Sequence, residues 1–246
     1  MNVKNIKSFI EFYEYLGIST FITPYSRNFK KTDEKIKILF KTKDNSRDTE
    51  SFADKNYQLK LLKERITKSN CNLKDIATNL VFSEGNYDSK IMIIGEAPGA
   101  EEDRIGKPFV GQAGKLLDEM LKFISLNRSK NIYLTNIVFW RPPGNRTPNS
   151  EEIRICLPFV LEHIDIINPK LIIVLGNVAS KALLEKTDGI TKLRTQEHSY
   201  INKKNVKIPV KAIFHPAYLL RNPSEKEKTW DDLKKIYDYG LKNKLL

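Results

Sequence analysis

The chain is poor in cysteine and has no long apolar run, and each absence excludes a class of protein. Its two cysteines, Cys71 and Cys156, provide neither a disulfide framework nor the CxxC pairs and nearby histidines of a zinc site. No stretch approaches the roughly 18 apolar residues of a membrane span, and the N-terminus has no basic-then-apolar signal sequence. We therefore expect a cytoplasmic protein without a membrane partner.

The common phosphate-binding motifs are absent as well. An apolar run that predicts a buried strand ends in Gly95-Glu96-Ala97-Pro98-Gly99. No Gly-Lys-Ser or Gly-Lys-Thr follows, and the spacing is not that of the dinucleotide fingerprint. A long, glycine-rich, acidic loop at the carboxyl end of a parallel strand is nevertheless a place where α/β proteins bind ligands.

What the chain has in excess is positive charge. It carries 42 basic and 30 acidic residues, for a net charge of +12. This balance favours a polyanion as partner, because phosphates that are neutralised by a protein release counterions. The alternative is a lysine-rich composition from an AT-biased genome, which the abundance of Asn, Ile and Lys also fits.

Strand and helix patterns alternate from about residue 71 onward, which predicts an α/β fold with a parallel sheet covered by helices on both faces. The expected strands are 91–95, 132–138, 171–176 and 210–214. The expected helices are 57–66, 114–125, 150–167, 178–186 and 225–240.

Residues 1–56 are expected to form a separate N-terminal segment, and residues 57–246 the main domain. Apolar residues recur with helical spacing over 6–16, whereas 27–56 is polar and charged and has the composition of a linker.

The loop after the first strand offers two kinds of functional side chain. Its carboxylates, Glu96 and Glu102 among them, could orient a water or stabilise a cation-like transition state, or they could be solvated and cap the following helix. Phe109 lies between a proline and a glycine, where its ring could form a stacking platform for a base. The alternative is a phenylalanine of the core.

Two further strand ends carry polar residues. Asn136 ends the second strand, and its amide offers a donor and an acceptor that suit the edge of a pyrimidine. His215 ends the last strand and precedes a proline, where it could donate to an oxyanion or serve as a structural cap. Because Glu96, Asn136 and His215 all follow strands of one parallel sheet, we expect them to share a single crevice. The stiff basic loop 141–148 beside it suits a phosphate backbone.

The segments that carry these residues resemble, in order, the motifs of the type-4 uracil-DNA glycosylases. The matching segments are GEAPGAEED, GKPFVGQAG, TNIVFWRPPGNRTP and HPAYLLR, and the resemblance extends from about residue 70 to about residue 235. Four long motifs in the right order form a specific signature. The resemblance implies a three-layer α/β/α sandwich with a central four-stranded parallel sheet. It also implies hydrolysis of the N-glycosidic bond of uracil in DNA, leaving an abasic site, in a monomeric bacterial enzyme.

The resemblance also implies a role for each matching position. Phe109 would stack on the flipped uracil, Asn136 would read its polar edge, and His215 would stabilise charge on the departing base. Three further groups are implied. Glu96 and Glu102 would position the water or support the site; Ala97 and Asn145 would lie near the substrate; and Arg141, Arg146, Tyr218, Leu219 and Arg221 would contact DNA.

One departure from the family pattern concerns a cofactor. Type-4 enzymes normally bind a [4Fe-4S] cluster through four cysteines, but here Cys71 and Cys156 match only the second and fourth, while Lys68 and Trp140 occupy the other positions. Such a cluster requires four ligands, and neither Lys nor Trp supplies a thiolate. We therefore expect no cluster and no other metal.

Three functions remain open at this point. The first is a uracil-DNA glycosylase of base-excision repair. The second is a DNA-binding protein that keeps the fold but has lost catalysis, which loss of the cluster would motivate. The third is a glycosylase for another deaminated base, since pocket shape decides the base and the Ala97 position, often Gly in the family, could alter it.

Overall fold

The computed structural model describes residues 46–246, with side chains described from Lys55 onward. The helix expected over 6–16 lies outside the described residues. Helix α2 spans Ser46–Thr67, so residues 46–56 are helical where the composition predicted a polar linker. The proposed domain boundary at residue 56 stays a prediction.

Six strands form one sheet in the order β1-β3-β2-β4-β6-β5. The four central strands β3, β2, β4 and β6 are parallel to one another, as predicted. Short antiparallel strands, which the sequence analysis missed, extend the sheet on both sides. The bounds are β1 Glu84–Gly85, β2 Ile91–Gly95, β3 Ile132–Asn136, β4 Leu171–Leu175, β5 His198–Ile201 and β6 Lys207–Ile213.

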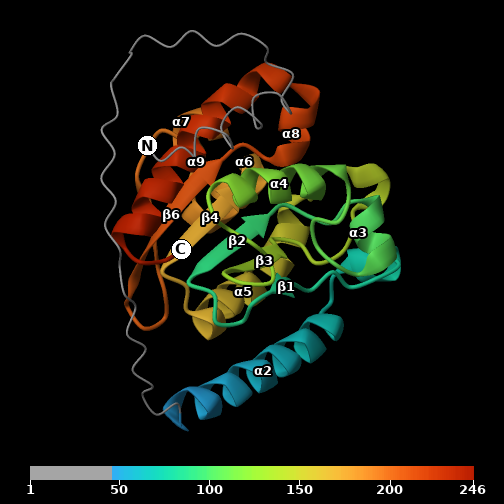
Figure 1. The fold of residues 1–246 in the computed structure, drawn as a ribbon. Helices are drawn as coiled ribbons and strands as arrows, with labels where there is room; N and C mark the ends of the chain where they lie inside the picture. The colour runs from blue at the N-terminus through green and yellow to red at the C-terminus, as the bar shows by residue number, and fades with distance from the viewer. Residues whose placement is uncertain (1–45) are drawn as a thin grey trace, which may run out of the picture. The chain divides into compact units, whose positions relative to one another are not determined.

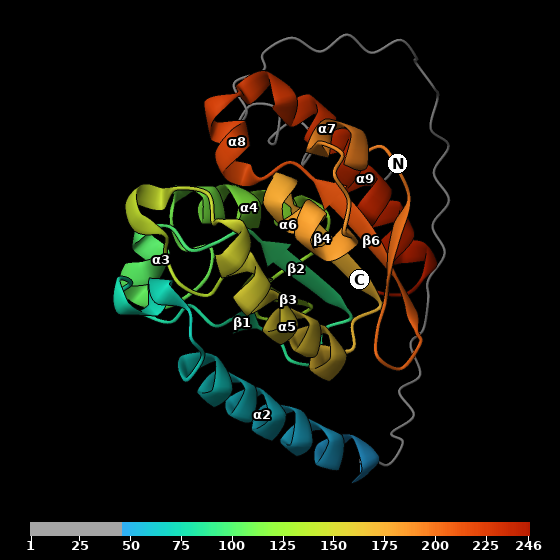
Figure 2. The same ribbon diagram turned by 180° about the vertical axis from the view of Figure 1, so that it is seen from behind.

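Helices cover both faces of this sheet (Figures 1 and 2). Helices α4 and α9 lie on one face, and α5 and α6 lie on the other, which gives the expected three layers. The remaining bounds are α3 Ala100–Ile105, α4 Gln112–Phe123, α5 Ser150–Ile167, α6 Gly176–Leu184, α7 Ile190–Leu193, α8 Pro216–Arg221 and α9 Lys226–Lys242, with short 3₁₀ turns at Asn72–Asp75, Pro143–Asn145 and Pro223–Glu225.

The central strands β2, β3 and β4 are buried along their whole length, as expected of parallel strands between two helical layers. Alternate side chains point to opposite faces. Met92 and Ile94 of β2 join the core that includes Leu62 of α2 and Val160 of α5. This burial fixes the register of the strands and therefore the position of their carboxyl ends.

The sequence predicted one long loop between β2 and α4, but a helix interrupts this segment. Residues Ala100–Ile105 form helix α3, which ends at Gly106 in a left-handed conformation with φ of 78°. Its first turn carries three acidic residues, a placement that the partial positive charge of a helix N-terminus favours. No helix of the described part of the chain is long and apolar enough to cross a membrane.

Candidate active site

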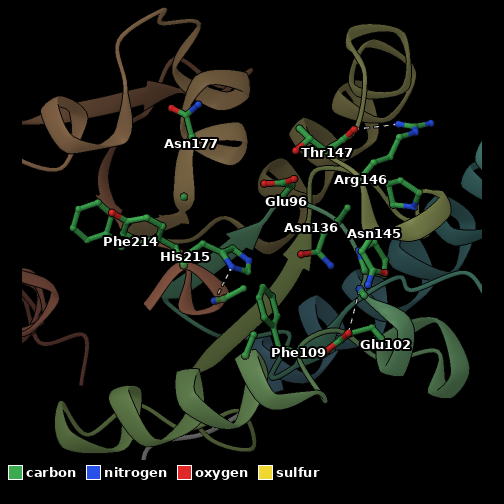
Figure 3. A pocket seen from close by; sticks show the side chains of 18 of the residues that line it. Glu96, Glu102, Phe109, Asn136, Asn145, Arg146, Thr147, Asn177, Phe214 and His215 are labelled. Carbon is green, nitrogen blue, oxygen red and sulfur yellow. Dashed lines mark hydrogen bonds between the residues drawn. The ribbon is translucent and has the colours of Figure 1, made fainter. Parts of the chain in front are cut away.

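A pocket of about 490 Å³ opens at the carboxyl ends of the four parallel strands. Figure 3 shows Phe109, Asn136 and His215 facing a common space, with Glu96 beside them. The expected convergence of strand ends is therefore present in the structure. Ten of the predicted site residues line the pocket: Glu96, Ala97, Glu102, Phe109, Asn136, Asn145, Arg146, His215, Tyr218 and Arg221.

Asn136 places its amide at the bottom of this pocket. The side chain is 2% exposed, and its Oδ1 atom is buried without a hydrogen-bond partner. Gly95 on the neighbouring strand makes room, because a Cβ atom there would lie 2.4 Å from that oxygen. A buried acceptor without a partner is costly, so the amide is prepared for a donor that enters the pocket.

Phe109 forms an aromatic wall beside the amide. Its ring is 6% exposed and its centroid lies 6.2 Å from that of the His215 ring. The backbone has a φ of 55°, which is unusual for a residue with a side chain. Gly114 permits this turn, since a Cβ atom there would lie 1.9 Å from the Phe109 carbonyl oxygen.

The carboxylate of Glu102, which also lines the pocket, binds three backbone N–H groups. Its Oε1 accepts from the N–H groups of Val110 and Gly111 at 2.9 and 2.8 Å, and its Oε2 accepts from Gly99 N–H at 3.1 Å. These donors belong to the turns that open helices α3 and α4. The capping alternative therefore describes the contacts of Glu102, and two of these contacts hold the C-terminal end of the loop that carries Phe109.

Glu96 is the carboxylate that remains available to the pocket. Burial raises its pKa above the usual range, while a hydrogen bond from Thr147 and the charge of Arg221 act in the opposite direction. A carboxylate with a raised pKa is a stronger proton acceptor when ionised. Glu96 therefore has the environment of a residue that can orient and deprotonate a water.

His215 is neutral near pH 7, because burial and the charge of Arg221 lower its pKa to about 4. Its Nδ1 atom accepts a hydrogen bond of 3.2 Å from Ala217 N–H, so the proton resides on Nε2. Gly176 at the end of β4 has a φ of 81°, and a Cβ atom there would lie 2.8 Å from the His215 Cβ. The imidazole is thus placed as a neutral hydrogen-bond donor.

The arginines of the basic loop 141–148 form hydrogen bonds within the protein. Arg146 donates to both carboxylate oxygens of the buried Glu152, at 2.9 and 2.6 Å, and keeps 43% of its side chain exposed. Arg141 does not line the pocket; it donates to Asn145 Oδ1 at 2.7 Å. The loop therefore presents its arginines from a fixed backbone, and only part of the Arg146 charge is free for a phosphate.

Helix α8 carries the HPAYLLR segment and corrects one prediction. Leu219 is 0% exposed, because it lies on the inward face of the helix, so it is not a surface contact for DNA. The next residue, Leu220, is 42% exposed. Tyr218 and Arg221 line the pocket, and their contact with DNA stays a prediction.

Several lining residues escaped the sequence analysis. Gly176 and Asn177 follow β4 just as Glu96 follows β2, and the same strand-end argument could have found them. Thr147 belongs to the basic loop 141–148 but was not singled out within it, and Ile190 is brought to the pocket by tertiary structure without a local pattern that marks it.

Three of the four positions of the family's cluster ligands lie in the packed core. Cys71 and Cys156 are 3% and 0% exposed, and both belong to the hydrophobic core. Trp140 is 3% exposed and packs edge-on against Phe139, whereas Lys68 is exposed to solvent. Among the described residues no group of three or more His, Cys, Asp or Glu side chains could hold a metal ion.

The pocket lies at the switch point of an α/β sheet and combines a buried amide with an aromatic ring. Comparison with known proteins identifies the family to which the chain is similar. The profile of the uracil DNA glycosylase superfamily matches residues 82–234.

Characterised relatives match over most of their length. The type-4 uracil-DNA glycosylase of Thermotoga maritima is 44% identical over 168 residues, which cover 68% of this chain and 85% of the relative. That of Sulfurisphaera tokodaii is 41% identical over 74% of this chain and 84% of the relative. A type-5 uracil-DNA glycosylase of Pyrobaculum aerophilum is 30% identical over 55% of this chain and 64% of the relative. The chain belongs to the uracil-DNA glycosylase superfamily, and within it to the type-4 family, as the motifs indicated.

Proposed function

We propose that this protein hydrolyses the N-glycosidic bond of uracil in DNA and leaves an abasic site for base-excision repair. The observation that carries the proposal is the buried, unpartnered Oδ1 atom of Asn136 beside the ring of Phe109. Uracil presents a donor at N3 next to an acceptor at O4, which is the complement of a carboxamide. Stacking on Phe109 would hold the ring in plane.

The pocket supports a hydrolytic mechanism. A base within a duplex must first be flipped out before its glycosidic carbon can be reached. As the bond breaks, the sugar gains positive charge and uracil leaves as an anion. Nε2–H of the neutral His215 donates to the developing negative charge on uracil O2. Glu96 orients a water toward the sugar carbon and accepts its proton, so that carbon gains a hydroxyl and uracil leaves.

We further propose that the protein works without an iron–sulfur cluster. The residues at the ligand positions do not fit one: only the second and fourth positions carry thiols, the third is a buried indole and the first a solvent-exposed lysine. The net charge of +12 and the arginines beside the pocket support DNA as the substrate. A monomer is the expected state.

Excision from labelled oligonucleotides tests the proposal. The substrates carry one uracil opposite G, opposite A or in a single strand, with hypoxanthine and thymine as comparisons. We expect multiple turnovers and alkali-labile cleavage at uracil alone. Salt-sensitive binding without cleavage would instead identify a DNA-binding protein, and cleavage at hypoxanthine would identify a different base specificity.

Two variants test the residue roles in the same assay. Asn136→Ala and His215→Ala should each lower the single-turnover rate by about 100-fold or more, because each removes a hydrogen bond that strengthens in the transition state. DNA binding should stay nearly unchanged. Undiminished turnover in either variant would contradict the assigned role.

A further inference from the structure

The backbone at Phe109 is held in an unfavourable conformation, and the structure shows what holds it. A φ of 55° places a residue with a side chain in the left-handed region, which persists only where surrounding contacts impose it. The turn at this position directs the ring toward Gly95 and the pocket. Whatever fixes the peptide groups of residues 108–111 therefore fixes the stacking surface.

Arg128 binds the carbonyl side of this turn. Its Nη1 donates to the Pro108 carbonyl oxygen at 2.8 Å, and its Nη2 donates to the Phe109 carbonyl oxygen. The guanidinium is itself held by two carboxylates, with Nε donating to Asp118 at 2.6 Å and Nη1 to Glu84 at 2.9 Å. With 17% of its side chain exposed, Arg128 is a fixed group rather than a mobile surface cation.

The opposite side of the same turn is bound by an anion. The carboxylate of Glu102 accepts from the N–H groups of Val110 and Gly111. Carbonyls bound by a cation and amides bound by an anion hold the peptide groups in one orientation, and hydrogen bonds to charged groups are the strong ones. The two charges thus act on the Phe109 backbone from both sides.

We infer that Arg128 is a positioning residue, outside the pocket, that sets the ring of Phe109 for stacking on the flipped base. This inference rests on the proposed function for its catalytic consequence. The planar guanidinium is required because it binds two carbonyls at once, which a lysine ammonium cannot reproduce with the same geometry.

A double-mutant cycle with Phe109→Leu tests the inference. In the wild-type background Arg128→Gln should lower single-turnover excision by about 10- to 100-fold, as expected when a stacked group is displaced by about 1 Å. In the Phe109→Leu background the same change should cost less than about threefold, because the ring through which it acts is gone. Equal losses in the two backgrounds would overturn the inference.

Two further variants separate positioning from folding. Asp118→Asn keeps an acceptor for Arg128 and leaves both carbonyl contacts in place, so its excision rate should stay within about twofold of wild type. Arg128→Lys keeps the charge and should fall between wild type and Arg128→Gln. If Arg128→Gln does not melt cooperatively, Arg128→Lys takes its place in the cycle.

An NMR measurement keeps the inference testable apart from excision. The ring of Phe109 lies 6.2 Å from that of His215, and the chain has three histidines, so the His215 ring signals can be assigned by substitution. Arg128→Gln should shift these signals as Phe109→Leu does, and Asp118→Asn should leave them in place. Unshifted signals in Arg128→Gln would refute the positioning role, whereas an inactive wild-type protein would refute the proposed function instead.

Discussion

Burial shifts the pKa values of Glu96 and His215, two ionisable side chains of the pocket, in opposite directions. It raises the pKa of Glu96 and lowers the pKa of His215 to about 4. Both shifts favour the uncharged form, yet each residue gains the property that its role requires. The histidine donates without carrying charge, and the carboxylate becomes a better base.

Thr147 should tune this carboxylate. Its hydrogen bond stabilises ionised Glu96, so Thr147→Val should raise the pKa of Glu96 further and shift the acid limb of the pH–rate profile to higher pH. We expect a loss of about three- to tenfold on the acid side and little change above it. Profiles of single-turnover rate against pH check this.

Thr147→Ser is the matched variant, because it keeps the hydroxyl and removes only a methyl group. Its profile should coincide with that of wild type. An acid limb that stays in place in Thr147→Val would show that this hydroxyl does not act on the group that controls the rate.

The argument from strand ends located Glu96, Asn136 and His215, whereas Phe109 and Tyr218 were found through their motifs. Asn136 and His215 could be found because the ends of parallel strands meet at one edge. Arg128 and Thr147 could not, because their contacts to Phe109 and Glu96 exist only after the chain folds. Leu219 was assigned to DNA from its motif, although the helical period decides which leucine is buried.

At the scale of elements, long apolar patterns were predictable and short elements were not. Helix α5 and strand β2 occur with the predicted bounds. The residues that begin the helix and the apolar run that forms the strand can both be recognised in the local sequence. Strand β1 has two residues and α3 has six, too few for a period to appear. Helix α2 begins at Ser46, within a polar stretch. The apolar spacing that predicts a helix starts only at residue 57.

Helix α8 provides a prediction about its two adjacent leucines. Leu219→Ala should lower the free energy of unfolding by about 2–5 kcal/mol, because it opens a cavity in the core. Leu220→Ala should change it by less than about 0.5 kcal/mol but should slow excision from a duplex more than from a single strand, if the exposed leucine supports the opened base stack. Urea denaturation and paired excision assays measure both.

Leu219→Ala and Leu220→Ala serve as controls for one another. The same chemical change is made at neighbouring positions of one helix, so differences report burial and position alone. Equal effects of Leu220→Ala on duplex and single-stranded substrates would argue against a role in holding the duplex open.

At the scale of the whole molecule, a histidine outside the pocket should govern stability in acid. His163 is 0% exposed, with the Phe82 ring at 4.6 Å and the Phe139 ring at 5.8 Å between centroids. This burial lowers its pKa to about 3. The unfolded chain binds a proton near pH 6.5, so the neutral histidine contributes stability above that pH, and this contribution is lost as the pH falls toward 3.

Comparison with His163→Leu isolates this contribution. Between pH 7 and pH 4.5 the wild-type protein should lose about 2–3 kcal/mol more of its free energy of unfolding than the variant. Urea denaturation at both pH values gives the difference. Parallel losses in the two proteins would assign the acid sensitivity to other groups.

Strand β1 has a consequence for how copies of this protein meet. It pairs with β3 along two residues only, and Gly85 adopts a φ of 114° at a point where a Cβ atom would lie 2.3 Å from the Ile132 carbonyl oxygen. Its other residue, Glu84, is bound by Arg128 and Lys107. A strand this short, bent and charged offers no template for another sheet, so edge-to-edge association is disfavoured on the side that carries Asn136.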